Sequence, residues 1–363
     1  MLAAPGELGV DAAYPIGELW SKLPELLRNY ERLAYRTGQD EARDRELLAM
    51  LARMRAQTRA NWTAPQEVLD AAAVLHELRL FKSPAEIEVM RRAAAITAEA
   101  HVAAMRAARP GVRENEIEAL IEYTFRRRGA TAPAYGTIVA GGEHACTLHY
   151  VRNDAVLRNG DLLLIDAGAE FDCYASDVTR TFPVNGRFSA EQRALYQVVL
   201  DAQLAAIERV RPGAAFSDVH DAALRVLVGG LIELGLLGGA LDDELKKDDF
   251  KRFYMHRTSH WLGLDVHDCG TYVHNGASRR LEPGMVLTVE PGLYIAADDE
   301  RVEQRWRGIG IRIEDDVLVT AGGGEVLTAA VPKSIAELEA LIGAESNGHE
   351  KSPSAAPRSR PGP

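Results

Sequence analysis

Asp166 and Asp177 are the residues whose surroundings most clearly indicate chemistry. Asp166 follows four consecutive apolar residues, Leu162 to Ile165, which is typical of a buried strand. A carboxylate carried into such a place is costly unless a cation lies beside it. Asp177 comes 11 residues later, and Gly168 between them allows the chain to fold back as a hairpin. The two carboxylates are therefore expected to face one site.

A histidine-rich stretch, residues 255–268 with the sequence MHRTSHWLGLDVHD, supplies a second group of reactive side chains. It holds three of the ten histidines in the chain, His256, His260 and His267. The first two would share one face of a helix, but the serine and the glycine within the stretch favour an irregular segment. One histidine alone is most simply explained as a core or surface residue. Three within twelve positions weaken that explanation for the group.

Two further acidic residues end or line apolar strands. Glu290 closes the strand-like MVLTVE and precedes a Pro-Gly pair, so its carboxylate lies where a strand meets a turn. In the alternating GIGIRIEDD, residues 308–316, the isoleucines share one face and Arg312 and Glu314 share the other. Taken alone, Arg312 and Glu314 are more simply explained as a plain ion pair. The two aspartates that follow, Asp315 and Asp316, are expected to be solvated.

Five residues thus combine four carboxylates with one imidazole: Asp166, Asp177, His260, Glu290 and Glu314. Four anions converging in a core would repel one another, and their pKa values would rise unless cations held them ionised. Two divalent metal ions would do so. Oxygen and nitrogen ligands without a thiolate favour manganese, cobalt, zinc or iron over copper(I) or an iron–sulfur cluster, and the sequence leaves the choice among these metals open.

Five segments that carry these residues resemble the pita-bread metallopeptidases, and most closely the bacterial Xaa-Pro aminopeptidase (aminopeptidase P) group. They are FKSPAEIEVMRRA, IDAGAEFDCYASDVTRTFPVNGRF, SHWLGLDVHDCG, LEPGMVLTVEPGLYI and RGIGIRIEDDVLVT, and the resemblance spans His76 to Val331. It implies an α+β fold with a pita-bread catalytic domain, in which helix, helix and strands occur twice around a curved antiparallel sheet.

By this resemblance, Asp177 and Glu314 bridge two divalent metal ions, Asp166 binds one of them, and the other is completed by His260 and Glu290. The family metal is usually Mn2+, with Co2+ or Zn2+ as alternatives. The implied reaction releases the N-terminal residue from peptides with proline in the second position. In it, a metal-bridging water attacks the carbonyl that precedes the proline nitrogen.

The resemblance also assigns roles to residues around the metals. Glu290 would accept a proton as well as bind metal. His149 and His267 match histidines that position the substrate and stabilise the tetrahedral intermediate, and Arg312 belongs with this catalytic group. Three residues are implied to bind the substrate: His256, which matches a histidine lining the proline pocket, Tyr135 and Tyr294.

Three other functions remain open from the residues. A prolidase would cleave only the Xaa-Pro dipeptide, although the FYMHRTSHWLG stretch favours the aminopeptidase. A non-catalytic pita-bread protein would bind a peptide or a partner protein, as relatives that have lost their ligands do, but all five ligand positions are filled in this chain. A creatinase-like hydrolase uses the same fold without metal and would not need this set of acids.

Two pairs of helices are predicted to position these strands and loops. The Ser-Pro-Ala-Glu sequence at 83–86 combines an N-cap, a first-turn proline and a capping box, and predicts a helix that runs to about residue 110. A helix over 114–128 and strands over 135–140, 146–150 and 162–182 follow. A second capping box at Ser189 and Gln192 begins a helix, with another helix over 218–236 and strands over 285–290 and 309–319. The repeated order favours a duplicated architecture around one central sheet.

The chain is predicted to divide into three parts. Residues 1–75 would form a small α/β domain, with helices near 19–27 and 41–56 and a strand near 32–36, and a helix from 68 leads into the catalytic domain, 76–343. The tail, 344–363, is rich in proline, serine, glycine and charge and is predicted to be disordered. The resemblance implies a longer N-terminal domain, with an acidic residue linked to the tyrosine and arginine of the site and an aromatic loop that reaches a neighbouring subunit. The short N-terminus is therefore either natural or a start assigned too late.

The composition of the 363-residue chain excludes several classes of protein. A net charge of −11 argues against a nucleic-acid surface, which needs clustered lysine and arginine. Three cysteines without a C-x-x-C spacing indicate neither a disulfide framework nor a thiolate zinc site, and they fit a cytoplasmic location. Without a run of about 18 apolar residues or a signal peptide, no membrane partner is expected. The expected partners are peptide substrates with proline in the second position and further copies of the chain, as a dimer or a tetramer.

Overall fold

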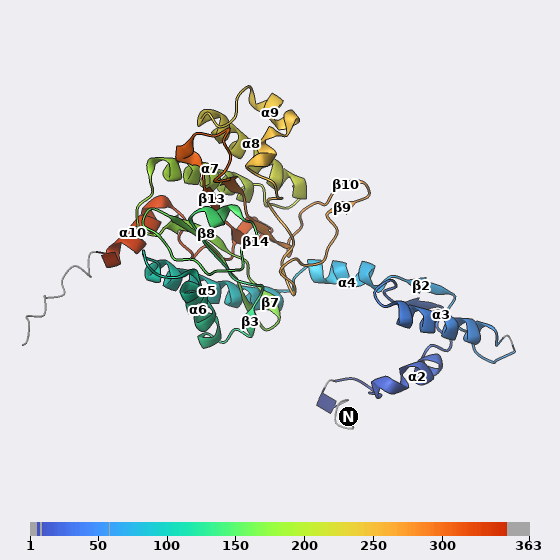
Figure 1. The fold of residues 1–363 in the computed structure, drawn as a ribbon. Helices are drawn as coiled ribbons and strands as arrows, with labels where there is room; N and C mark the ends of the chain where they lie inside the picture. Colours follow the sequence, from blue (N-terminus) through green and yellow to red (C-terminus); the bar gives the residue numbers. More distant parts are fainter. Residues whose placement is uncertain (1–5, 8, 58, 347–363) are drawn as a thin grey trace, which may run out of the picture. The chain divides into compact units, whose positions relative to one another are not determined.

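The computed structural model describes residues 6–7, 9–57 and 59–346 (Figure 1). The chain forms two compact units that divide between Leu78 and Arg79. Most of the tail that is predicted to be disordered, residues 347–363, lies outside the described residues. Within the described ranges, no helix is long and apolar enough to cross a membrane.

The N-terminal unit combines helices and strands around its own small core. Its elements are η1 (Ile16–Glu18), α2 (Leu19–Leu26), β1 (Arg32–Ala34), α3 (Glu41–Arg55), β2 (Glu67–Leu69) and most of α4 (Ala71–Leu80). β1 and β2 pair in parallel. The Asp40 side chain caps α3 by accepting a hydrogen bond from the Arg43 amide. The helix then buries four residues at helical spacing: Leu47, Met50, Leu51 and Met54.

The larger unit begins with two helices, α5 (Pro84–Ala107) and α6 (Glu114–Arg127). The predicted capping box of α5 is confirmed, because the Ser83 amide donates to Glu86 Oε2 at 2.7 Å and the Glu86 amide donates to Ser83 Oγ. The elements that follow are β3 (Ala132–Pro133), β4 (Ile138–Gly141), the 3-10 helix η2 (Gly142–Cys146), β5 (Leu162–Asp166), β6 (Ala169–Phe171), β7 (Tyr174–Ala175) and β8 (Thr179–Pro183). β4, β5 and β8 form one antiparallel sheet, and β3, β6 and β7 form another.

The second half of this unit repeats the order of elements. Its helices are α7 (Ala190–Ile207), α8 (Phe216–Glu233), α9 (Leu241–Lys247) and η3 (Asp249–Arg252). Then come β9 (Val273–His274), β10 (Ala277–Ser278), β11 (Val286–Val289), β12 (Gly292–Ile295), η4 (Gln304–Trp306), β13 (Ile309–Arg312), β14 (Asp315–Thr320), β15 (Gly323–Val326) and α10 (Ile335–Ser346). β11, β14 and β15 form an antiparallel sheet, and β12 pairs with β13. In Figure 1 the strands lie between the α5 and α6 pair and the α7 and α8 pair, so the predicted duplication of helix, helix and strands is confirmed.

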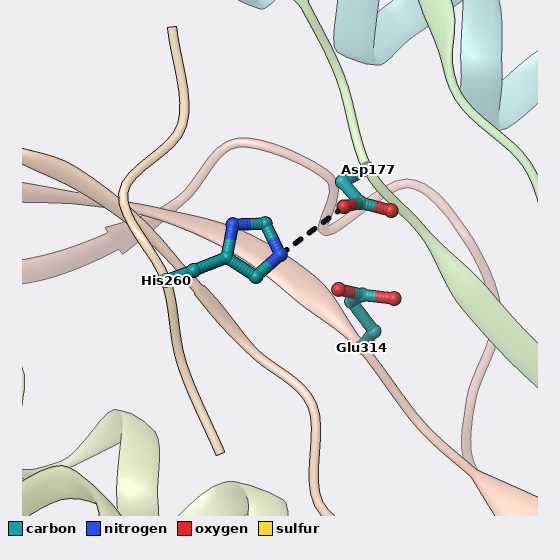
Figure 2. Close-up of side chains that lie close together, drawn as sticks. All are labelled: Asp177, His260 and Glu314. Atoms are coloured by element: carbon teal, nitrogen blue, oxygen red, sulfur yellow. Dashed lines mark ion pairs between the residues drawn. The ribbon is translucent and has the colours of Figure 1, made fainter. Parts of the chain in front are cut away.

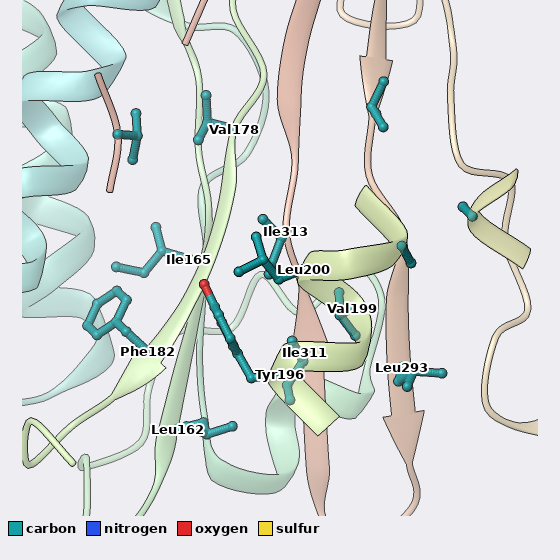
Figure 3. Close-up of a cluster of buried hydrophobic side chains, with 14 of the residues drawn as sticks. Leu162, Ile165, Val178, Phe182, Tyr196, Val199, Leu200, Leu293, Ile311 and Ile313 are labelled. Atoms are coloured by element: carbon teal, nitrogen blue, oxygen red, sulfur yellow. The ribbon is translucent and has the colours of Figure 1, made fainter. Parts of the chain in front are cut away.

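The core of the larger unit fills the space between these strands and helices. Figure 3 shows buried side chains from β5, β8, α7, β12 and β13 that pack together: Leu162, Ile165, Phe182, Tyr196, Val199, Leu200, Leu293 and Ile311. Burying one large aliphatic side chain stabilises a fold by roughly 1.5–3 kcal/mol. The isoleucines of residues 308–316 all lie in this core, as their alternation predicts. Arg312 and Glu314, on the other face of the same segment, are left to line a cavity.

Several predicted strands differ from the structure. Residues 146–150 form no strand and pair with no other strand of the described ranges. Tyr150, at the end of this segment, instead donates a hydrogen bond from its hydroxyl to the buried carboxylate of Glu114 at 2.9 Å. The strand predicted over 309–319 is two strands, β13 and β14, which pair with different partners on either side of Ile313 and Glu314. Residues 162–182 form four strands, of which β5 and β8 are the outer pair of the predicted hairpin.

The expectation that Asp315 and Asp316 are solvated is wrong. Asp315 is fully buried, and its carboxylate lies 2.7 Å from Arg180 Nη2 and 2.7 Å from Lys333 Nζ. Asp316 is 1% exposed and accepts a hydrogen bond from Ser176 Oγ at 2.8 Å. A buried carboxylate is stable only with such partners. Here the partners come from segments far away in the sequence, which the local pattern does not contain.

Candidate metal centre

One cavity of about 990 Å3 gathers the predicted site residues in the larger unit. All of them line it except Tyr294. The Tyr294 hydroxyl lies 2.8 Å from His256 Nε2 and accepts a hydrogen bond from Arg312 Nη1 at 3.0 Å. Histidine rings, carboxylates and a guanidinium group therefore meet in one space large enough for a peptide-sized ligand.

The antiparallel pair of β5 and β8 brings Asp166 and Asp177 together. Asp166 ends β5 opposite Thr179, and Asp177 lies two residues before Thr179. The chain returns through Gly168, where a Cβ atom would lie 1.6 Å from the Ser176 carbonyl oxygen. Only glycine permits this close approach, so Gly168 is what allows the two carboxylates to share a site.

Three side chains form the tightest group of ligand atoms. Asp177, His260 and Glu314 each offer one atom, and the three atoms lie within 4.8 Å of one another (Figure 2). His260 Nε2 is 3.4 Å from Asp177 Oδ2 and 3.4 Å from Glu290 Oε1. Its other nitrogen, Nδ1, lies 3.0 Å from the Trp261 carbonyl oxygen and must donate to it, which leaves Nε2 to face the carboxylates. Two oxygen donors and one nitrogen donor at this spacing could hold a divalent metal ion.

Asp166 lies beside this group and is held by two other residues. The Tyr135 hydroxyl is 2.6 Å from Asp166 Oδ1 and 2.5 Å from Asp177 Oδ1, so it lies between the two carboxylates. Arg312 Nη2 donates to Asp166 Oδ2 at 2.6 Å. Because Arg312 is only 4% exposed, this ion pair is buried, and its acidic partner is Asp166 and not the Glu314 of the plain ion pair considered from the sequence.

The buried side chain of Thr179 forms hydrogen bonds with both Arg312 and Glu314. The Thr179 hydroxyl accepts from Arg312 Nε at 3.0 Å and donates to Glu314 Oε2 at 2.6 Å. Thr179 is fully buried, and the Glu314 amide also bonds to its carbonyl oxygen. Glu314 is thereby oriented although it lies in the break between β13 and β14.

Three of the clustered carboxylates, those of Asp166, Glu290 and Glu314, have raised pKa values. Burial, followed by the charges of Asp177 and Glu290, raises the pKa of Glu314 well above its usual range. Burial also raises the pKa of Asp166, and that of Glu290 to about 7. Burial alone would lower the pKa of His260, but the hydrogen bond to Asp177 and the charge of Glu290 raise it to about 9. A cationic ligand between these groups would relieve the repulsion that the sequence predicts.

The other predicted histidines lie around this centre. The His256 ring has its pKa lowered to about 4 by burial and by the charge of Arg312, so it is neutral near pH 7. His267 contacts the His260 ring edge-on, with the ring centroids 4.5 Å apart. His149 lines the cavity from an exposed position in the loop after η2.

Sequence reasoning misses three residues of the site. Thr179 is not distinguished in its strand, because a buried threonine is common in strands. Asp316 accepts a hydrogen bond from the Asp177 amide at 3.1 Å and so holds the backbone of a predicted ligand. His220 of α8 lines the cavity, and its Nδ1 is 2.8 Å from Thr258 Oγ1. No signal in the helical pattern around His220 separates it from an ordinary half-buried histidine.

Comparison with known proteins identifies the family of the chain. Residues 88–321 match metallopeptidase family M24. The chain is 48% identical over 340 residues to the Xaa-Pro aminopeptidase of Escherichia coli (strain K12), covering 94% of this chain and 77% of that protein. It is 46% identical over 339 residues to the Xaa-Pro aminopeptidase of Haemophilus influenzae, covering 93% and 76%.

Solved structures agree with the sequence relatives. The structure of aminopeptidase PepP from Pseudomonas aeruginosa matches with a TM-score of 0.91 and 50% identity, covering 95% of this chain and 78% of that one. A variant of E. coli aminopeptidase P in complex with substrate matches with a TM-score of 0.89 and 48% identity, with the same coverage. The resemblance noted from the motifs is thus confirmed, and the chain belongs to metallopeptidase family M24, with the pita-bread fold.

Proposed function

We propose that this protein is a metal-dependent aminopeptidase that releases the N-terminal residue from peptides with proline in the second position. The observation that carries the proposal is the group of Asp177, His260 and Glu314, which face one cavity together with Glu290. Relatives that share nearly half of the sequence are named Xaa-Pro aminopeptidases.

The chemistry of the donor atoms fits divalent metal ions. Asp177, His260 and Glu314 would hold one ion, with Glu290 as a further ligand. Asp166, together with Asp177 and Glu314, would hold a second. Carboxylate and imidazole donors without a thiolate suit Mn2+, which we propose as the metal, and also Co2+ or Zn2+. When bound, the ions supply positive charge that makes a water molecule more acidic and polarises the carbonyl group of the substrate.

The residues around the ligands have separate tasks in this proposal. Glu290, with its pKa raised to about 7 by burial, is suited to accept a proton near neutral pH. His149 and His267 would donate hydrogen bonds to the oxygen on which negative charge develops. The charge of Arg312 opposes the rise in the pKa of Asp166 that burial causes, and Arg312 orients the carboxylate through the bond between Nη2 and Oδ2.

The other three residues would shape the substrate pocket. The neutral ring of His256 can lie against an apolar proline ring without burying a charge. Tyr294 fixes that ring by its bond to His256 Nε2, and Tyr135 closes the cavity beside the two aspartates. We further propose a cytoplasmic protein that acts on peptides as a dimer or a tetramer.

The direct test measures activity and metal in one sample. Purified protein should cleave an Xaa-Pro-Xaa tripeptide and carry about two metal ions per chain by elemental analysis. A dipeptide Xaa-Pro measured in parallel separates this function from that of a prolidase. Metal-loaded protein that cleaves no Xaa-Pro-Xaa peptide would contradict the proposal.

A further inference from the structure

His149 lines the cavity from a loop, and the backbone of that loop fixes the position of its ring. The loop runs from Gly141, at the end of β4, to Ala155. Among the residues that the structure describes, none forms a hydrogen bond with the His149 ring itself, and the residue is exposed. The position of the ring in the cavity therefore depends on how firmly the loop backbone is fixed.

One buried carboxylate fixes that loop at four points. Glu114 is the first residue of α6 and is fully buried. Four groups of the loop bond to its two oxygens: the Gly141 amide at 2.8 Å, His144 Nδ1 at 3.0 Å, the Tyr150 hydroxyl at 2.9 Å and the Ala155 amide at 2.9 Å. A carboxylate has about four acceptor positions, so this loop uses all of them. Hydrogen bonds to a charged acceptor are about twice as strong as neutral ones.

Tyr150 is the residue next to His149 that contacts Glu114, and two interactions hold it. Tyr150, the next residue in the chain, bonds to Glu114 through its hydroxyl and stacks on the His144 ring, with centroids 4.5 Å apart and planes 22° apart. Gly141 lies so close to the carboxylate that a Cβ atom there would be 3.3 Å from Glu114 Oε1. The loop therefore has little freedom to move away from Glu114.

A second buried residue ties the far end of the loop to β4. Asn153 is fully buried, accepts from the Val139 amide at 2.9 Å and donates to the Thr137 carbonyl oxygen at 2.8 Å. The loop is thus held on both sides of His149, while the side chain of Glu114 does not line the cavity.

We propose that Glu114 is a positioning residue for the reaction, acting through Tyr150 and the loop to hold the His149 ring at the substrate. This inference rests on the function proposed above, and in particular on the role of His149. Glu114 touches neither the substrate nor the proposed metal ligands, so its loss should lower turnover and leave metal binding unchanged.

Replacing Tyr150 with phenylalanine is the mildest test, because it removes one hydrogen bond and keeps the ring that stacks on His144. In the metal-loaded enzyme, Tyr150→Phe should lower kcat about tenfold, with KM and metal content unchanged. In a His149→Ala background the same change should lower kcat by less than about twofold, since the residue on which it acts is gone. Glu114→Gln should lower kcat by more than about tenfold in the unaltered enzyme, and again by much less in the His149→Ala background.

Tyr35→Phe is the matched control. Its hydroxyl donates to Asp44 at 2.8 Å in the N-terminal unit, a bond of the same kind that has no link to His149. We expect no change of kcat in that variant. If His149→Ala itself lowers kcat, and Tyr150→Phe then lowers kcat by the same factor with and without His149, the positioning role of Glu114 is refuted while the proposed role of His149 stands. An unimpaired His149→Ala enzyme would overturn the role of His149, and the inference with it.

Discussion

Replacing Thr179 with valine should destabilise the protein by a predictable amount. The residue is fully buried, and its hydroxyl donates to Glu314 at 2.6 Å and accepts from Arg312 at 3.0 Å. Valine keeps the shape of the side chain and removes both bonds, so one buried acceptor and one buried donor lose a partner. Each such group costs about 1–3 kcal/mol, and the free energy of unfolding should therefore fall by roughly 2–6 kcal/mol.

The assay is urea unfolding of the metal-depleted protein, followed by tryptophan fluorescence. Thr137→Val is the matched control, because Thr137 is also buried at 2% exposure but its hydroxyl oxygen has no hydrogen-bond partner among the described residues. The free energy of unfolding should be unchanged or slightly raised in that variant, since valine removes a polar atom that the fold does not satisfy.

A second measurement separates stability from the site. Side chains that orient metal ligands typically contribute about 10–100-fold to metal affinity, so titration of Thr179→Val with Mn2+ should show a loss of that size. Thr137→Val should bind Mn2+ as the unaltered protein does. Equal unfolding free energies and equal affinities in the two variants would refute the bridging role of the Thr179 hydroxyl.

Three further changes probe other parts of the larger unit. Asp177→Ala should abolish activity and lower the metal content measured by elemental analysis, with the circular dichroism spectrum retained; full activity would refute the bridging assignment. His149→Ala should keep near-normal metal content and lose about 10²-fold in kcat, so a large loss of metal would assign His149 to the ligands. Buried His101, whose Nε2 donates to the Ala167 carbonyl oxygen at 3.1 Å, has its pKa lowered by burial to about 4. The folded state therefore resists protonation, and stability that is complete above about pH 6.5 should fall by roughly 2 kcal/mol by pH 5. His101→Gln, compared by urea unfolding at pH 7.5 and pH 5, should lose that part of the pH dependence, and an unchanged dependence would contradict it.

The sequence predicts the features that depend on local pattern. The apolar run before Asp166 and the 11-residue spacing to Asp177 predict a pair of strands with two acids at one end, and β5 and β8 form that pair. The capping boxes and the helical spacing likewise predict α5 and α7 within one or two residues of their starts. These signals are local, because the residues that cause them are neighbours in the chain.

The features that the sequence does not predict depend on distant partners. Asp315 looks solvated in a polar EDD run, yet it is buried against Arg180, more than one hundred residues earlier in the chain. The sequence around Thr179 does not distinguish it, because its role depends on hydrogen bonds with two distant charged residues, Arg312 at the end of β13 and Glu314 just after that strand. The strand predicted over 146–150 is absent, and the contact that its last residue makes is also with a distant residue, because the Tyr150 hydroxyl donates to Glu114 at the start of α6.

The bonds that Asp166 makes to Tyr135 and Arg312 have a consequence for how the enzyme would acquire its metal. A buried carboxylate that already has a hydroxyl and a guanidinium as partners does not require an ion for the chain to fold around it. Small zinc domains differ, because there the binding free energy of the metal is the folding free energy. We therefore expect the chain to fold before it takes up metal and to keep its fold when the metal is removed. The ion it carries would then depend on which divalent cations are abundant around it, as expected for oxygen and nitrogen ligands of modest selectivity.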